Sequence, residues 1–180
     1  MPSHLALIRG INVGGKNLIR MTDLRAAFES MGFDDVATYI QTGNVFFDAP
    51  RQKRAELAGR IEAALQEEFK SPLKVVLLTR SRLEKVVDEA PKGFGGPDHR
   101  CDVIFLRSPL TVARAFPLLE PREGVDEAWR GPGVLYFSRL AAKASGSRLS
   151  RIVALPEYQD MTIRSWSTTT KLLGVMDARS

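Results

Sequence analysis

Short apolar runs alternate with two segments of helical periodicity over the first 80 residues, and this order constrains the fold more than any other feature. Runs of aliphatic and aromatic residues predict strands at residues 4–9, 36–41, 45–48 and 73–78. Apolar side chains recur at helical spacing in two segments, at Leu24, Ala27, Phe28 and Met31 and again at Leu57, Ile61, Leu65 and Phe69. The resulting order, strand–helix–strand–strand–helix–strand, is that of the βαββαβ unit of ferredoxin-like folds.

Polar and turn-forming residues predict where these two helices begin. Thr22 is the expected N-cap of the first helix, because a hydroxyl there would accept a hydrogen bond from the first turn. Asp48 and Pro50 are expected to open the second helix, since proline is favoured in the first turn.

The second half of the chain partly repeats this order. A capping box of Ser81 and Glu84 predicts a linking helix, and a glycine-rich boundary loop follows over residues 92–100. Strands are predicted at residues 103–106, 125–129, 134–137 and 161–164, and helices at 109–117, 147–155 and 168–176, the last one capped by Ser167 or Thr168. The prediction is an α+β protein of tandem ferredoxin-like βαββαβ halves with antiparallel sheets and a C-terminal helix. The halves are expected to be residues 1–92 and 93–180, packed as one compact unit.

Composition and charge narrow the classes of function. The formal net charge is +5, and residues 139–180 hold seven basic and three acidic side chains. This balance permits an anionic partner but lacks the dense basic stripe of a duplex-DNA binder. Cys101 is the single cysteine and no apolar stretch is long enough to span a membrane, so a cytoplasmic location is expected. His4 and His99 are expected on the surface, and no ligand spacing predicts a metal or a cofactor.

Three stretches of the sequence resemble those of one known family. They are residues 9–17 (RGINVGGKN), 38–45 (TYIQTGNV) and 161–168 (MTIRSWST). The first two resemble the hallmark stretches of domain-of-unknown-function family 1697, a widespread bacterial family, and the third resembles its T-x-R-N-W-N-T stretch. Ser165 and Ser167 stand where that pattern prefers asparagine, and serine lacks the paired donor and acceptor of an amide. The resemblance implies a tandem ferredoxin-like fold and no activity, because the family is uncharacterised.

The glycine-rich loop is the strongest candidate for a binding site. Residues 10–16 match the first seven positions of a phosphate-binding P-loop, but Asn17 replaces the hydroxyl that would bind magnesium. Four residues also separate the loop from the expected helix cap, so a P-loop NTPase is rejected. The loop should still lie beside the turn of residues 42–44, because both fall at one end of a βαββαβ sheet. Glycines there would let backbone N–H groups form a concave anion site, although loop and turn would equally serve as structural turns.

The function favoured by these observations is binding of a small anionic ligand, a nucleotide or phosphate ester. The predicted ligand-binding residues are Arg9, Asn12, Gly14, Gly15, Lys16, Thr42, Gly43, Asn44 and Arg164. Trp166 is predicted to fill the interface between the two halves rather than to stack on a ligand, and whether a reaction follows binding is left open. One alternative is an RNA- or single-strand-binding module, with Phe46 and Phe47 as the stacking residues. The other is a protein-interaction or oligomerisation module that uses the loop or a sheet edge.

Overall fold

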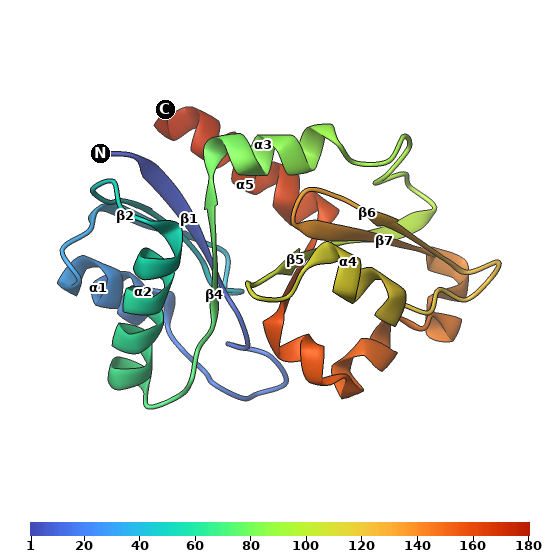
Figure 1. The fold of residues 1–180 in the computed structure, drawn as a ribbon, viewed down its shortest axis with the longest axis horizontal. Coiled ribbons are helices and arrows are strands. Elements are labelled where there is room, and N and C mark those ends of the chain that lie inside the picture. The colour runs from blue at the N-terminus through green and yellow to red at the C-terminus, as the bar shows by residue number, and fades with distance from the viewer. The chain divides into compact units, whose positions relative to one another are not determined.

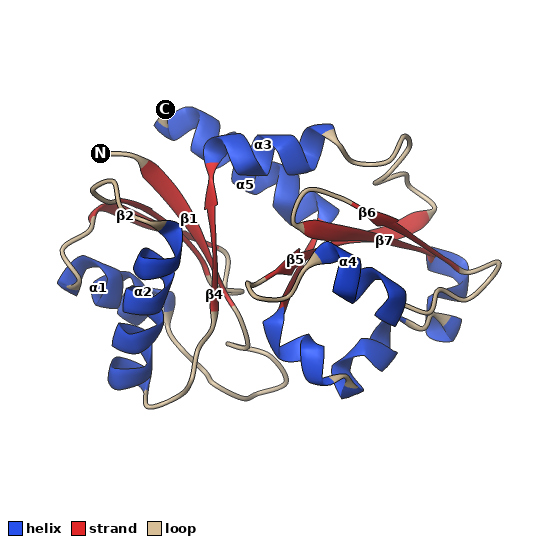
Figure 2. Ribbon diagram, in the orientation of Figure 1, coloured by secondary structure: helices blue, strands red, loops and turns tan.

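The computed structural model describes residues 1–180 and divides into two compact units (Figure 1). The first consists of residues 1–81 and 174–180, and the second of residues 82–173. Each unit is built on a four-stranded antiparallel sheet that carries helices (Figure 2). Two helices, α3 (Arg80–Asp88) and α5 (Trp166–Arg179), begin in one unit and end in the other. The predicted α+β class is confirmed, including its C-terminal helix.

The first unit has the predicted βαββαβ order. Its elements are β1 (Ser3–Ile8), α1 (Met21–Ser30), β2 (Asp34–Tyr39), β3 (Asn44–Asp48), α2 (Arg54–Phe69) and β4 (Val75–Thr79). The strands lie in the order β2-β3-β1-β4, and β1 pairs antiparallel with both β3 and β4 at the centre of the sheet. This is the ferredoxin-like topology, and it places the loop after β1 and the turn before β3 at the same end of the sheet.

Helices α1 and α2 pack on one face of this sheet and bury the core of the unit (Figure 1). The rings of Phe28, Phe33 and Phe47 lie with centroids 4.6 to 6.1 Å apart. Leu57, Ile61 and Leu65 recur every four residues along α2 and are fully buried. Each such side chain contributes roughly 1.5–3 kcal/mol through burial, so this face holds the helices against the sheet.

The second unit repeats the sheet order with shorter helices. Its elements are β5 (His99–Leu106), α4 (Val112–Ala115), β6 (Asp126–Arg130), β7 (Val134–Leu140) and β8 (Met161–Ser165). The strands lie in the order β6-β7-β5-β8, the counterpart of the first sheet. Between β7 and β8, where the first unit has α2, stand three 3₁₀ segments, Ala141–Gly146, Leu149–Ala154 and Pro156–Asp160. The helix predicted over 147–155 is therefore a 3₁₀ turn.

Two predicted helix starts in the first unit are wrong. The N-cap of α1 is Arg20, whose carbonyl accepts hydrogen bonds from the amides of Asp23 and Leu24, so Thr22 lies inside the first turn. Asp48 does not open α2, because it still belongs to β3 and pairs with Ser3 of β1. Helix α2 begins six residues later than Asp48, at Arg54.

Three later helix starts also differ from the predictions. Helix α3 follows β4 directly at Arg80, so Ser81 is not its N-cap. Helix α4 begins at Val112, where the Thr111 hydroxyl accepts from an amide of the first turn, and not at residue 109. Helix α5 begins at Trp166, and its cap is Ser165 rather than Ser167 or Thr168.

The two histidines occupy different environments, and His4 corrects the expectation of two surface residues. His4 is half-buried, its ring stacks on Phe47 with centroids 5.4 Å apart, and its buried Nε2 has no hydrogen-bond partner. His99 is exposed, as expected. Among the helices, none combines the length and apolar character needed to cross a bilayer.

Candidate functional site

Asn12 joins the glycine-rich loop to the β2–β3 turn. Its side-chain amide donates to the carbonyl of Gln41 at 2.8 Å and to that of Ile19 at 3.0 Å, and its Oδ1 accepts from the Ile19 amide at 2.8 Å. The residue adopts a positive φ of 55°, which asparagine tolerates better than most residues. All three hydrogen bonds are made to other residues of the chain, so the Asn12 amide holds the base of the loop.

The loop itself is a miniature β-hairpin. The amide of Lys16 donates to the carbonyl of Val13 at 3.0 Å, and the amide of Asn12 donates to the carbonyl of Asn17 at 3.1 Å. Gly14 and Gly15 between them have φ values of 59° and 74°, the signature of a type I′ turn. This turn requires two residues with positive φ, and the pair of glycines supplies them without steric cost.

The β2–β3 turn beside the loop is also fixed by hydrogen bonds. The amide of Ile8 donates to the carbonyl of Gly43 at 2.8 Å, which fixes the turn against the end of β1. Gly43 has a φ of 85°, and a Cβ there would lie 2.8 Å from the Cδ1 atom of Ile11, so no larger residue fits. Asn44 is buried and donates to the carbonyl of Tyr39 and to the Thr42 hydroxyl, both at 2.9 Å.

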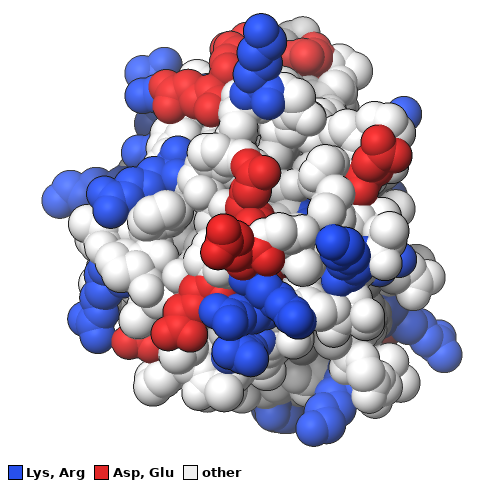
Figure 3. All heavy atoms as spheres, turned by 90° about the vertical axis from the view of Figure 1, so that its right-hand side faces the viewer, with Lys and Arg blue, Asp and Glu red and all other residues white.

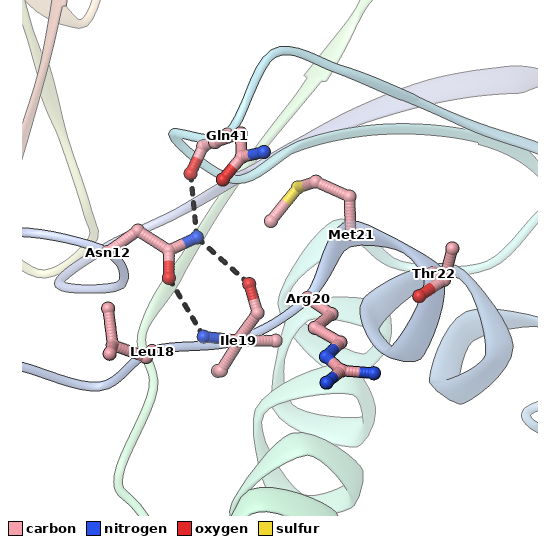
Figure 4. Close-up of a pocket in the computed structure, with 7 residues that line it drawn as sticks. All are labelled: Asn12, Leu18, Ile19, Arg20, Met21, Thr22 and Gln41. Atoms are coloured by element: carbon pink, nitrogen blue, oxygen red, sulfur yellow. Dashed lines mark hydrogen bonds between the residues drawn. The ribbon is translucent and has the colours of Figure 1, made fainter.

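A pocket of about 490 Å³ opens beside the base of the loop (Figure 4). It is lined by Asn12, Leu18, Ile19, Arg20, Met21, Thr22 and Gln41. Three of these residues form the start of α1, where no side chain caps the helix. Amides in an uncapped first turn, together with the helix dipole, favour a negatively charged group. The seven side chains that line the pocket comprise one guanidinium, one hydroxyl, two carboxamides and three apolar groups. Such a set can bind and orient a ligand.

The end of the first unit that holds this pocket has more cations than carboxylates: Asp23 lies in the first turn of α1, and the Glu62 carboxylate accepts from the Val75 amide at 3.2 Å. Three segments meet there, since the amide of Arg9 donates to the carbonyl of Lys74 at 2.9 Å and the Ser71 hydroxyl donates to Asn17 at 3.3 Å. Residues 9–22, 38–47 and 70–76 contain five Lys and Arg residues and no Asp or Glu. This excess of positive charge favours the approach of anions.

The predicted site residues fall into two groups. Eight of the nine belong to the loop and the turn of the first unit, which the structure brings together, and Asn12 is the one of them that lines the pocket. Their role as ligand-binding residues stays a prediction. The pocket residues missed by that prediction are Leu18, Ile19, Arg20, Met21, Thr22 and Gln41. If the sequence had identified Arg20 as the N-cap of α1, the residues around this helix start would have been candidates for the pocket.

Arg164, the ninth predicted residue, lies in the second unit on β8. It is buried, and one of its guanidinium nitrogens donates to the carbonyl of Ile163 at 3.0 Å. Burial lowers the pKa of this guanidinium to about 10. The group therefore stays charged at neutral pH, and its role in ligand binding stays a prediction.

Trp166 packs in an aromatic cluster within the second unit, and its predicted place at the interface between the halves stays a prediction. The Phe94 ring contacts Trp166, Tyr136 and Trp129 edge-on, with centroids 5.1, 5.4 and 5.9 Å apart. Next to it, the Ser165 hydroxyl accepts from the Thr168 amide at 3.2 Å and caps α5. Serine and asparagine are about equally good N-caps, so serine keeps this role where the family pattern has asparagine.

The stacking residues of the nucleic-acid alternative are not exposed. Phe46 and Phe47 are both fully buried, and the Arg179 guanidinium lies over the Phe46 ring at 5.7 Å. On the face drawn in Figure 3, Lys and Arg side chains are interspersed with Asp and Glu rather than gathered in one stripe. Single-strand binding uses an exposed aromatic platform and a continuous basic track. The buried rings of Phe46 and Phe47 do not supply the first, and the mixed charges on this face do not supply the second.

Comparison with known proteins settles the family. Residues 1–136 match DUF1697, described as a protein of unknown function. The chain belongs to DUF1697. The predicted family is thereby confirmed, and the family description assigns no activity to it.

A solved structure confirms the fold of this DUF1697 chain. The conserved bacterial protein SP0830 from Streptococcus pneumoniae is similar with a TM-score of 0.85 and 24% sequence identity. The match covers 97% of this chain and 98% of that one. At this level of identity the similarity carries the fold alone. A search of curated proteins finds no match.

Proposed function

We propose that this DUF1697 protein binds a small anionic ligand, a nucleotide or another phosphate ester, in the pocket beside the glycine-rich loop. One observation carries the proposal: the pocket combines the Arg20 side chain with the start of α1, where no side chain caps the helix, and the segments around it hold more cations than carboxylates. Both features favour a negative charge at the same place, and the Asp23 carboxylate in the first turn of α1 opposes part of this effect.

The other pocket residues support a ligand with more than a bare phosphate. Leu18, Ile19 and Met21 offer apolar surface, and the Thr22 hydroxyl and Gln41 amide offer hydrogen bonds. A volume of about 490 Å³ falls within the roughly 300–1,000 Å³ usual for small-molecule sites. A nucleotide or phosphate ester would place its phosphate at the start of α1 and its remaining part on the apolar side.

A thermal-shift screen tests the proposal. Phosphate, pyrophosphate, nucleotides and sugar phosphates are added at two salt concentrations, and a ligand at about 100 times its dissociation constant should stabilise the protein by roughly 2.7 kcal/mol. The stabilisation should be lost in Arg20→Ala. It should persist in Arg25→Ala, which removes a cation from the same helix but from an ion pair with Glu29 rather than from the pocket.

Two results would contradict the proposal. One is a screen in which none of these anions raises the unfolding temperature. The other is a hit whose stabilisation survives both Arg20→Ala and Thr22→Val, because the ligand would then bind somewhere other than this pocket.

A further inference from the structure

We infer that the tip of the glycine-rich loop and the adjacent β2–β3 turn form a docking surface for an acidic segment of a partner protein. The surface consists of Val13, Lys16, Leu18 and Ile40, and we refer to it as the loop surface. It lies next to the anion pocket but depends on different side chains, except that Leu18 borders both. The inference therefore goes beyond the proposed function and does not require a phosphate ligand.

The apolar side chains of the loop surface are unusually exposed. Leu18 is 76% exposed, Val13 67% and Ile40 45%, and these are three of the five large apolar side chains that the chain leaves exposed. Gathering three of them at one end costs solubility, and contiguous exposed apolar surface marks interaction sites.

The Asn12 hydrogen bonds join the chain segments that carry these three residues. Val13 follows Asn12 in the chain, Leu18 precedes Ile19, and Ile40 precedes Gln41, and Asn12 bonds to both Ile19 and Gln41. Each exposed side chain is thus a direct neighbour of one residue of a single hydrogen-bonded junction. The surface is preformed, so a partner would not have to order the loop on binding.

Ile40 is held in a conformation that isoleucine disfavours. Its φ is 47°, in the left-handed region, where a β-branched residue is a steric outlier. Glycine or asparagine would adopt the same turn with less strain, and asparagine would expose no apolar surface. A strained and exposed isoleucine at a turn is unfavourable for the isolated chain, and contact with a partner accounts for it.

Charge identifies the kind of partner. Lys16 pairs with Val13 across the miniature hairpin, so a cation lies directly beside an apolar side chain. The segments around the loop surface contribute further cations, among them Arg20 and Lys70, and these cations outnumber the nearby carboxylates. Complementarity therefore requires acidic residues around an apolar anchor.

Binding of designed peptides tests the inference on the full chain. The probe is a fluorescein-labelled amphipathic helical peptide with leucine along one face and glutamate on the other, followed by fluorescence polarisation. We expect saturable binding that is about tenfold weaker in Val13→Ser, the loss typical of one buried aliphatic side chain, and weaker again in Lys16→Glu. Val153→Ser is the matched control, because Val153 is a 60% exposed valine in the other unit, and it should not alter binding.

Three results would overturn the inference. They are equal binding of a peptide with serine in place of leucine, equal binding of a peptide with lysine in place of glutamate, and binding unaffected by Val13→Ser. Binding to phosphatidylglycerol vesicles without binding to the acidic peptide would also overturn it in favour of a lipid surface. Phosphate-induced stabilisation is measured in the same variants, and it should survive Val13→Ser, so that failure of either proposal is seen separately.

Discussion

At the scale of single residues, most of the polar side chains predicted as ligand contacts at this end of the first unit hold the backbone in shape. Asn12 and Asn44 use their amides to hold the loop and the turn, and Gly43 fits a space that a Cβ would fill. These residues were predicted as direct ligand contacts because their amides are good hydrogen-bonding groups. The structure adds that their internal partners satisfy much of that capacity, while Arg20 and Thr22 present theirs to the pocket.

Ile40 supplies a prediction at this scale. Replacing it by asparagine, which tolerates positive φ, should relieve the strained turn and stabilise the protein by about 1 kcal/mol. The measurement is the free energy of unfolding in urea. Ile40→Val is the control, since valine is also β-branched and should bring no gain. A loss of stability in Ile40→Asn would show that the apolar contacts of Ile40 outweigh its backbone strain.

At the scale of elements, the loop between α3 and β5 is the segment whose role the sequence obscured. Its glycines predicted a boundary loop, but Phe94 within it packs into an aromatic cluster of the second unit. The amide of Gly95 also donates to the Cys101 sulfur at 3.2 Å. The loop is thus an ordered cover rather than a flexible link, and no local pattern reveals this because Trp129 and Trp166 are distant in sequence.

Gly93 and Gly95 offer a matched pair of substitutions in this loop. Both have positive φ, 80° and 88°, but a Cβ at Gly93 meets no atom within 4 Å, whereas one at Gly95 would lie 2.3 Å from Trp166 Cδ1. Gly93→Ala should cost about 1 kcal/mol of stability from backbone strain alone. Gly95→Ala should cost about 1–3 kcal/mol more and change tryptophan fluorescence. Equal losses in the two variants would contradict the packing described here.

Element boundaries show where sequence reasoning fails. The hydrophobic pattern predicted all eight strands, since strands that are buried in a sheet appear in the sequence as runs of apolar residues. Helix starts were less predictable because the competing capping residues look alike: Ser165 caps α5 although Ser167 and Thr168 were equally plausible from their types. Asp48 was expected to open α2 because aspartate and proline favour a helix start, but the helix begins only at Arg54.

At the scale of the whole molecule, the fold was predictable and the site only in part. The order of elements determines the ferredoxin-like topology, and the topology places loop and turn together. The pocket depends on where α1 begins and which side of the loop faces it, and neither follows from periodicity. The loop surface exposes Val13, Leu18 and Ile40, and nothing in the sequence distinguishes these three from apolar residues that are buried.

The stability of the molecule should depend on pH through His4. Burial lowers the pKa of this imidazole from its usual value of 6.5, and Asp48 offsets part of the effect. The unfolded chain therefore binds a proton more readily than the folded one. This contribution to stability is complete above the unfolded pKa and is lost as the pH falls through it toward the folded pKa.

Thermal unfolding of wild type and His4→Phe at about pH 7.5 and 5.5 measures this effect. Wild type should lose more stability between the two conditions than His4→Phe, in which the ring packing on Phe47 is kept without a titratable group. His99→Phe, a change at the exposed histidine, should retain the wild-type dependence. An identical loss in wild type and His4→Phe would show that other groups account for the pH dependence.

The most direct test of the anion pocket is an NMR titration of the ¹⁵N-labelled full chain with pyrophosphate and with a nucleoside diphosphate. If the pocket binds phosphate as proposed, the backbone amides of Met21 and Thr22 and the side-chain amide of Gln41 shift first and saturate together. Shifts confined to residues away from this pocket, or none at millimolar ligand, would contradict the account.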